Sequence, residues 1–173
     1  MAGTACYLIR KASEHDALRI ARIHVRTWQA AYRGLLPDDF LDGLNPAQRA
    51  VAWKALIGAP NEWVLVAMRG NRIVGFCSLL PSRDAAAPPE IAELSSLYVD
   101  PREWGRGAGG NLIAAAVDHA TSHGFKILTL WVLSGNARGR CFYEKMGFEP
   151  DGVEKHDEKL GFPIHELRYW REL

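Results

Sequence analysis

The spacing of hydrophobic and polar positions changes several times along the chain. Near the start, apolar residues recur at steps of three and four, which is the spacing of one face of a helix. Ser13 and Asp16 precede this stripe with the spacing of a capping box, and Gly34 and Pro37 end it. The stripe consists of Leu18, Ala21, Val25, Trp28 and Tyr32. We therefore expect a first helix between residues 14 and 33.

The rest of the chain alternates between extended and helical segments. β-rich runs predict strands, while asparagine caps and glycine or proline stops delimit helices. Predicted strands cover residues 7–10, 63–68, 72–80, 91–99, 127–133, 153–156 and 164–170. Further helices are predicted at 46–57, 111–123 and 137–146, with a short one within 38–44. Residues 81–89 predict a mobile loop. Because the sequence contains no linker or repeat, we expect one mixed α and β domain over residues 1–173.

The composition excludes some classes of binding partner but does not indicate a function. A chain of 173 residues that is 48% hydrophobic can bury an ample core. Its net charge of +1, from 21 basic and 20 acidic residues, gives no general attraction to nucleic acid or to an anionic membrane. We therefore expect neither partner, and any anion must be bound locally.

Cysteine and histidine usage favours a reduced, metal-free protein. The three cysteines are odd in number and scattered, and the six histidines follow no metal-binding pattern such as His-Glu-x-x-His. Residues 1–10 lack a basic segment followed by a long apolar one, so we expect no signal peptide. No stretch approaches the length of a membrane span. The sequence thus predicts a cytoplasmic protein without a metal.

Glycines concentrate just before the helix predicted at 111–123. Gly105, Gly107, Gly109 and Gly110 expose backbone where a helix would present its first N–H groups, and this arrangement suits a phosphate anion. A P-loop is disfavoured because no Lys-Ser or Lys-Thr follows. A Rossmann loop would follow the first strand. A tight turn that packs the helix on the sheet is the remaining alternative. Nearby, Arg102 and Arg106 either bind phosphate or are solvated surface charge.

Two segments of the chain carry a resemblance to a known family. The first is Leu97-Tyr98-Val99-Asp100-Pro101 followed by Trp104-Gly105-Arg106-Gly107-Ala108-Gly109. The second contains Asn136, Phe142-Tyr143-Glu144-Lys145 and Gly147-Phe148. Together they resemble the pyrophosphate-binding motif and the second hallmark motif of the GNAT superfamily of N-acetyltransferases. Trp104 stands where the family often has Gln or Arg, and Gly139 where alanine is usual. The resemblance spans residues 9–171.

The resemblance implies a fold and a cofactor site. The implied fold is α+β, with a mostly antiparallel sheet of about seven strands, splayed between strands 4 and 5 and flanked by helices. Acetyl-coenzyme A would lie in that gap, with its pantetheine arm on the backbone of Leu97 and Val99 and its pyrophosphate on residues 105–110. The implied cofactor-binding residues are Leu97, Tyr98, Val99, Arg102, Trp104, Gly105, Arg106, Gly107, Ala108, Gly109, Gly110, Asn136 and Arg138.

Two residues are candidates for proton transfer. An aliphatic amine has a pKa of about 10 and must lose a proton before it attacks the thioester, while the departing thiolate must gain one. Tyr143 is the candidate acid, with core packing as its alternative. Glu93 is the candidate base, with a structural role or a water relay as alternatives. Strand alternation predicts that Glu93 shares a face with Leu97 and Val99.

The acceptor is less defined by the sequence. Trp28 and Tyr32 begin a Trp-x-x-x-Tyr-Arg-Gly-Leu-Leu-Pro run that resembles a GNAT subgroup with polyamine acetyltransferases, although core packing also explains both side chains. The implied activity is acetyl transfer to a primary amine of a small molecule or peptide, by direct attack in a ternary complex. The alternatives are a non-catalytic coenzyme A sensor, or an acyl-carrier or nucleotide-binding module. The resemblance also allows a homodimer.

Overall fold

The computed structural model describes residues 6–173. Residues 1–5, which belong to the predicted domain and to the segment tested for a signal peptide, lie outside the described residues. The elements in chain order are β1 (Leu8–Lys11), η1 (Glu14–Asp16), α1 (Ala17–Ala31), α2 (Asp38–Asp42), α3 (Pro46–Ile57), β2 (Trp63–Arg69), β3 (Arg72–Pro81), β4 (Ile91–Val99), η2 (Pro101–Glu103), α4 (Ala108–Ser122), β5 (Ile127–Leu133), α5 (Ala137–Lys145), β6 (Glu149–Asp157) and β7 (Ile164–Glu172).

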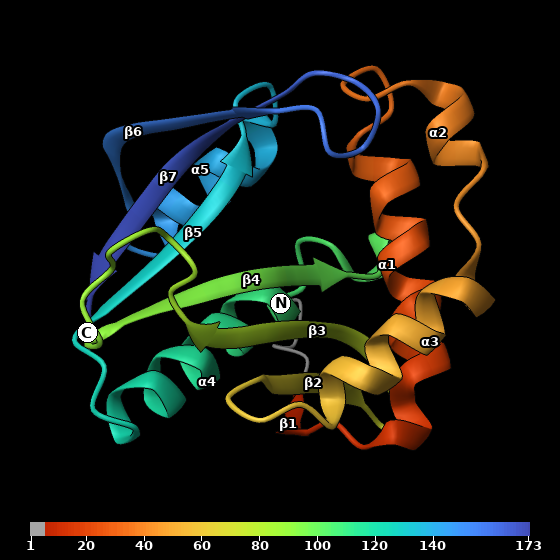
Figure 1. Cartoon of the computed structure of the whole chain (residues 1–173). Helices are drawn as coiled ribbons and strands as arrows, with labels where there is room; N and C mark the ends of the chain where they lie inside the picture. The colour runs from red at the N-terminus through yellow and green to blue at the C-terminus, as the bar shows by residue number, and fades with distance from the viewer. Residues whose placement is uncertain (1–5) are drawn as a thin grey trace.

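The strands form one seven-stranded sheet in the order β1-β2-β3-β4-β5-β7-β6. Every neighbouring pair is antiparallel except β4 and β5, which run parallel. Figure 1 shows β4 and β5 meeting near the C-terminus and diverging from there. The predicted α+β fold with a splay between strands 4 and 5 is therefore confirmed.

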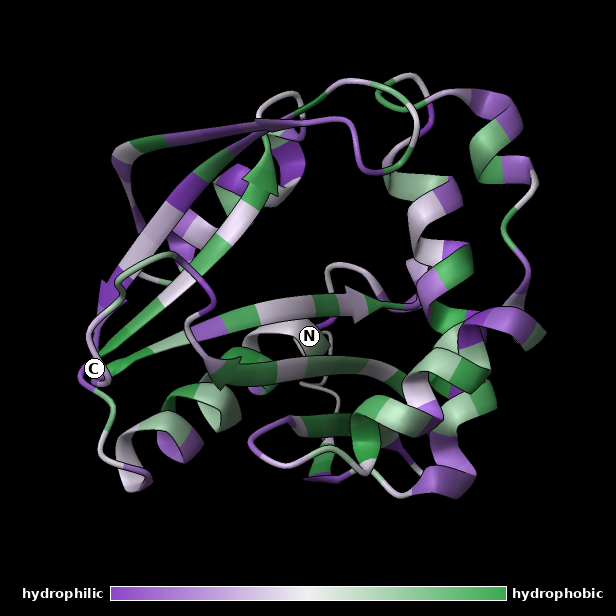
Figure 2. Cartoon of the chain, viewed as in Figure 1, coloured by the Kyte–Doolittle hydropathy of each residue, from purple (hydrophilic) through white to green (hydrophobic). Residues whose placement is uncertain are grey.

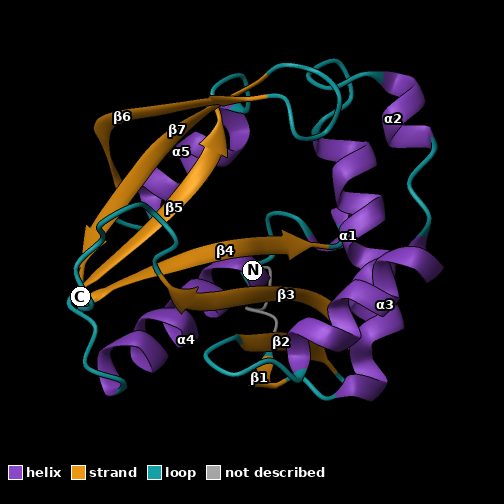
Figure 3. Ribbon diagram, viewed as in Figure 1, coloured by secondary structure: helices purple, strands orange, loops and turns teal. Residues whose placement is uncertain are grey.

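Helices cover both faces of this sheet (Figure 3). On one face, α1 and α3 bury a cluster with apolar residues of β2 and β3, centred on Ile20, Trp53 and Phe76. On the other face, α4 packs its small and aliphatic residues against β2, β3 and β4. Each buried side chain of this size contributes roughly 1.5–3 kcal/mol by leaving water, so both faces are needed to hold the splayed strands in place.

The first helix differs in part from its predicted stripe. The capping box is present, because the Asp16 carboxylate accepts a hydrogen bond from the Ser13 N–H at 2.9 Å. Within α1, however, Leu18 is 42% exposed, whereas Ile20 and His24 are buried. The buried face of α1 is therefore rotated from the predicted one. The prediction followed apolar residues alone, so it did not include a buried histidine.

The helix after the glycine loop begins three residues earlier than predicted. It starts at Ala108 rather than 111, with Gly107 as its N-cap in the left-handed region at φ +97°. Gly109 and Gly110 therefore form its first turn instead of a loop. The prediction assigned both glycines to the loop before the helix, but a glycine in a helix costs only about 1 kcal/mol relative to alanine.

The C-terminal edge of the sheet is polar. β6 is almost entirely exposed and largely hydrophilic, as Figure 2 shows. Charged residues on an edge strand disfavour pairing with a strand of another molecule. Among residues 6–173, no helix combines the length and apolarity that a membrane span requires.

Candidate active site

The gap between β4 and β5 creates a cavity of about 530 Å³. The two strands pair only over three positions, which end at Glu93 opposite Thr129. Beyond them, residues 94–99 of β4 have a strand partner on the β3 side alone. The peptide groups on the other side of β4 therefore face the cavity. An extended ligand could pair with them in the manner of an added strand.

Most of the predicted site residues line this cavity. They are Tyr32, Leu97, Tyr98, Val99, Trp104, Gly105, Gly107, Ala108, Gly109, Gly110, Asn136, Arg138 and Tyr143. Four others do not belong to its lining, namely Trp28, Glu93, Arg102 and Arg106. The arginines at 102 and 106 are exposed to solvent, as expected if they are ordinary surface charge. The glycine loop, the end of β4 and the start of α5 are thus brought together around one space.

The glycines are required by backbone geometry and by close packing. Gly105 and Gly107 have φ angles of +75° and +97°, a region that residues with a Cβ rarely adopt. A Cβ added to Gly109 would lie 3.0 Å from the Phe142 ring of α5. This close approach joins the first turn of α4 to α5. It also leaves the N-terminal N–H groups of α4 at the cavity wall, where an anion is stabilised by the helix dipole.

Trp104 links the loop to both sides of the cavity. Its indole N–H donates to the Val99 carbonyl at 2.8 Å, and the guanidinium carbon of Arg138 lies 3.7 Å from its ring centre. A stacked guanidinium keeps its N–H groups free at the edges for an anion. The departure from the family's usual Gln or Arg at 104 therefore serves to position Arg138.

Tyr143 is held in α5 beside Phe142 and Phe148, with ring centres 5.4 and 5.9 Å away. Burial raises the pKa of its phenol well above the ordinary value, and the nearby Tyr98 and Cys77 add to the effect. Its hydroxyl makes no hydrogen bond with another side chain in the part of the chain that the structure describes. The group is therefore a protonated donor at physiological pH, with its proton available to a ligand in the cavity.

Glu93 occupies a different environment from the one expected. It is 3% exposed and forms an ion pair with Arg83, whose backbone N–H also donates to the carboxylate at 3.2 Å. The structure therefore places Glu93 as an anchor for the loop after β3.

The predicted face of Glu93 is wrong. β4 carries a bulge at Ser95, because Ser78 pairs with Ser96 whereas its neighbour Leu79 pairs with Leu94. An extra residue in a strand reverses the alternation of side chains beyond it. Leu97 and Val99 consequently pack toward α4, whereas Glu93 shares the opposite face with Tyr98.

The helix α1 covers that opposite face of the sheet, and the two predicted acceptor residues lie on this helix and at its C-terminal end. Tyr32 lines the cavity, and Trp28 packs against it with ring centres 5.2 Å apart. Trp28 itself lies behind the cavity wall, between His24 and the guanidinium of Arg49. On the far side of the gap, Trp131 of β5 lines the cavity and donates from its indole to Asp84 at 3.2 Å.

Sequence reasoning missed several lining residues. Thr27 donates to the Val99 carbonyl at 3.0 Å and so ties α1 to the end of β4. Trp131 belongs to a strand with little polar interruption, so its position gave no signal. The further missed residues are Ala31, Leu94, Ser95, Ser96, Glu103, Val132, Gly139, Phe142, Lys145 and Met146. Those after Asn136 could have been found, since they lie within the span of the second motif.

The other reactive groups of the described chain do not form a nucleophilic site. Cys77 is fully buried, and burial raises the pKa of its thiol to about 12. A thiol is a nucleophile only as its thiolate, so this residue acts in packing. Cys6 and Cys141 are exposed free cysteines.

The splayed mixed sheet with a glycine-rich helix start at its gap agrees with the N-acetyltransferase fold that the two sequence motifs imply. The sequence profile of the Acetyltransferase (GNAT) family matches residues 17–148. The chain is 33% identical over 144 residues to the uncharacterized N-acetyltransferase YhfO of Bacillus subtilis, covering 83% of this chain and 90% of that protein. The protein therefore belongs to the GNAT acetyltransferase family and is an acyltransferase.

Solved structures agree with this fold. A ribosomal-protein-alanine N-acetyltransferase from Brucella melitensis superposes with a TM-score of 0.75 at 26% identity, covering 96% of this chain and 99% of that one. PaiA N-acetyltransferase from Thermoplasma acidophilum, in complex with coenzyme A, gives 0.77 at 19% identity over 97% and 99% of the two chains. Members of this family use acetyl-coenzyme A and an acceptor substrate.

Proposed function

We propose that this protein transfers the acetyl group of acetyl-coenzyme A to a primary amine of a small molecule or peptide, by direct attack in a ternary complex. The observation that carries the proposal is the open edge of β4 beside the N-terminus of α4. It offers unpaired peptide groups and an anion site within one cavity. These are the two features that a pantetheine diphosphate requires.

The cofactor would occupy the α4 side of the gap. Its pantetheine amides pair with the backbone of Leu97 and with the Val99 N–H, since the Val99 carbonyl already accepts from Thr27 and Trp104. Its diphosphate accepts hydrogen bonds from the N–H groups at 107–110. Arg138, held over the Trp104 ring, adds a positive charge beside that anion. Asn136 is occupied in accepting a hydrogen bond from the Gly139 N–H at 3.0 Å, so its contribution is to fix the start of α5.

The acceptor would enter from the α1 side. Tyr32, Tyr98 and Trp131 border the cavity, and the last two project from the face opposite to α4. Aromatic faces attract ammonium groups by cation–π interaction, which suits an amine that arrives protonated. Because successive side chains of β4 alternate between faces, the backbone at Leu97 can contact the cofactor while the Tyr98 ring borders the acceptor.

Proton transfer would use Tyr143 and water. Tyr143 lines the cavity and its phenol stays protonated, so it can donate to the departing thiolate. Glu93 is buried against Arg83 and lies outside the lining, which makes it a poor direct base. We therefore propose that a water relay, rather than the Glu93 side chain, removes the proton of the amine. Holding both substrates in one cleft supplies much of the remaining rate.

The test is a thiol-release assay with acetyl-coenzyme A and a panel of polyamines, aminoglycosides and peptide N-termini. For an accepted amine, Tyr143→Phe should lower kcat by about 10²- to 10⁴-fold while the coenzyme A affinity measured by calorimetry stays unchanged. Tyr7→Phe is the matched control, since Tyr7 is a buried tyrosine outside the cavity lining. Equal turnover by wild type and Tyr143→Phe would remove the proposed acid.

The same measurements separate the alternatives. A non-catalytic coenzyme A sensor would bind acetyl-coenzyme A but release no thiol with any amine. A nucleotide-binding module would bind adenosine diphosphates as well as it binds acetyl-coenzyme A. Failure to bind acetyl-coenzyme A at all would refute the assignment of the cavity.

A further inference from the structure

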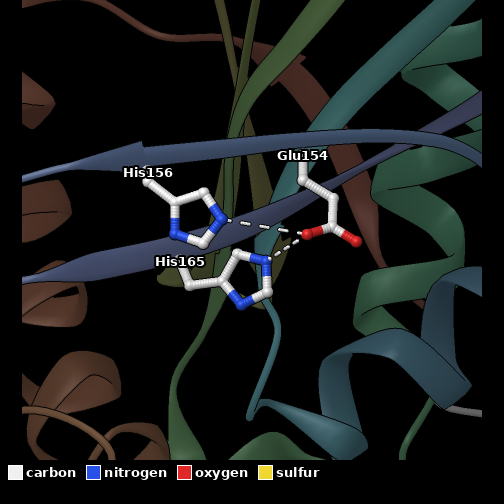
Figure 4. A group of neighbouring side chains, drawn as sticks. All are labelled: Glu154, His156 and His165. Carbon is white, nitrogen blue, oxygen red and sulfur yellow. Dashed lines mark hydrogen bonds and ion pairs between the residues drawn. The ribbon is translucent and has the colours of Figure 1, made fainter.

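A second cluster of reactive side chains lies on the β6–β7 hairpin. His156 of β6 pairs directly with His165 of β7, and Glu154 precedes His156 by two residues on the same strand. Residues paired across strands, and residues two apart on one strand, point to the same face. The three side chains accordingly extend to one side of the hairpin, as Figure 4 shows. None of them lines the cavity of the candidate active site.

Their potential ligand atoms converge. The Nε2 atoms of His165 and His156 lie 2.8 and 3.8 Å from the same carboxylate oxygen of Glu154. The three ligand atoms all lie within 4.8 Å of one another. Zinc bonds to imidazole and carboxylate are about 2.0–2.2 Å long, so tetrahedral ligands are separated by roughly 3.3–3.5 Å. Small side-chain rotations would therefore suffice to place one ion between these atoms.

The two imidazoles are also pre-aligned. Their ring centres are 4.2 Å apart and their planes differ by 8°. Each is fixed to a strand rather than to a loop, which limits the entropy lost when both bind one ion. Glu154 and His156 are about half or more exposed, so solvent reaches the cluster and water can complete the coordination. An adjoining hollow is lined by His156, Asp157, Glu158, Pro163, Ile164 and His165.

We propose that Glu154, His156 and His165 form a binding site for a divalent transition metal of the Zn²⁺ class. Two imidazoles and one carboxylate favour Zn²⁺, Ni²⁺ or Cu²⁺ over Mg²⁺ and Ca²⁺, which prefer oxygen ligands alone. This differs from the expectation drawn from the sequence. The two histidines are nine residues apart in the chain, and only the pairing of β6 with β7 brings them together.

The position of the site suggests what bound metal would do. β6 and β7 are joined by residues 158–163, and Phe162 in this connection packs on Phe40 of α2 with ring centres 4.9 Å apart. A metal bridging β6 and β7 beside the connection would stabilise the hairpin that contacts α2. The role is structural and does not depend on the proposed transferase reaction.

The test is a Zn²⁺ titration of the whole protein, freed of any affinity tag, in competition with a chromogenic chelator. One Zn²⁺ per chain should bind, with no displacement by excess Mg²⁺, and Zn²⁺ should raise the temperature of thermal unfolding. Loss of an outer-shell partner alone costs about 10- to 100-fold in metal affinity, so His156→Ala should weaken binding by at least roughly tenfold. Glu154→Gln, at a half-exposed position, is the second variant and should also weaken binding.

The control is His123→Ala. His119 and His123 form the other stacked histidine pair of the described chain, with ring centres 4.1 Å apart. If the proposal holds, His123→Ala binds one Zn²⁺ as tightly as wild type. No binding by the wild type, or binding lost in His123→Ala and kept in His156→Ala and Glu154→Gln, would overturn it. In that case the cluster is a hydrogen-bonded group of side chains that holds no metal.

Discussion

His24 makes the stability of this protein depend on pH. Its imidazole is 6% exposed, and it accepts a hydrogen bond on Nδ1 from the Trp53 indole at 3.0 Å. It stacks on Tyr98 with ring centres 4.9 Å apart. Its Nε2 is buried without a hydrogen-bond partner among the described residues. The environment therefore accommodates the neutral ring and opposes the charged one.

The magnitude follows from the shift in pKa. Burial, and secondarily the charge of Arg49, lowers the pKa of His24 from 6.5 to about 3. Below pH 6.5 the unfolded chain binds a proton at this residue that the folded protein refuses, so unfolding takes up a proton. The free energy of unfolding then falls as pH decreases, by about 1.4 kcal/mol per unit. Over the whole window from pH 6.5 to 3, the loss is about 5 kcal/mol, which is comparable with the total stability of many domains.

Urea unfolding between pH 7 and pH 4 would measure this effect. His24→Gln should abolish most of the slope below pH 6, because glutamine does not titrate but its carbonyl oxygen can still accept from Trp53. His119 also has a lowered pKa through partial burial, so His119→Gln is the comparison variant and should retain most of the slope. Asp16, with a pKa lowered to about 2 chiefly by its hydrogen bond from Arg10, contributes only below about pH 4.

Parallel curves for the wild type and His24→Gln would refute the reasoning. Parallel curves would mean that the His24 ring is protonated in the folded protein. The charged ring would then need a stabilising partner that the structure does not provide. The outcome bears on the site as well, because Tyr98, which stacks on His24, lines the cavity. Acid should therefore disturb this wall of the cavity before the domain unfolds.

Three further changes test the packing around the cavity. Gly109→Val should push the Phe142 ring away from α4 and weaken coenzyme A binding at least about tenfold by calorimetry, and wild-type affinity would contradict the close contact. Thr27→Val should lower the free energy of unfolding in urea by about 1 kcal/mol, since it removes one hydrogen bond to the end of β4. Arg69→Ala should cost about 3 kcal/mol in thermal unfolding, because Glu103 is left buried without its partner, and an unchanged melting temperature would argue against that burial.

The order of the elements could be predicted from the sequence because short-range signals agree with one another. The bounds of β4 and β5 match the prediction. Asn45 caps α3 as expected, accepting from the Ala47 N–H at 2.8 Å. Turn residues and asparagine caps act within a few positions of the chain, so they can be recognised in the sequence without knowledge of the fold. The start of α4 was missed because the contact that justifies Gly109 comes from Phe142, 33 positions later.

The direction of the side chains was harder to predict from the sequence than the position of the strands. One bulge at Ser95 reverses the face of every residue beyond it, and no local pattern announces a bulge in this strand. The error moved Glu93 to the wrong face and concealed that Tyr98 borders the acceptor side. The partner that explains Glu93, Arg83, belongs to a loop that the sequence predicted only as mobile.

The divergence of β4 from β5 is itself built by the chain. A parallel pair needs a crossover, and α4 supplies it, but the ladder between the two strands ends after three positions. Beyond that point the last carbonyl of β4 is held by Thr27 and Trp104 instead of by β5. Asp100, the next residue, donates its N–H to Val74 and pairs with Arg26 of α1 at 2.8 Å. The end of β4 is therefore anchored to α1, β3 and the glycine loop together. Closing the gap would break all of these contacts together, so the cavity is a fixed feature of the fold. It is preorganised for a ligand that pairs with β4 and completes the sheet.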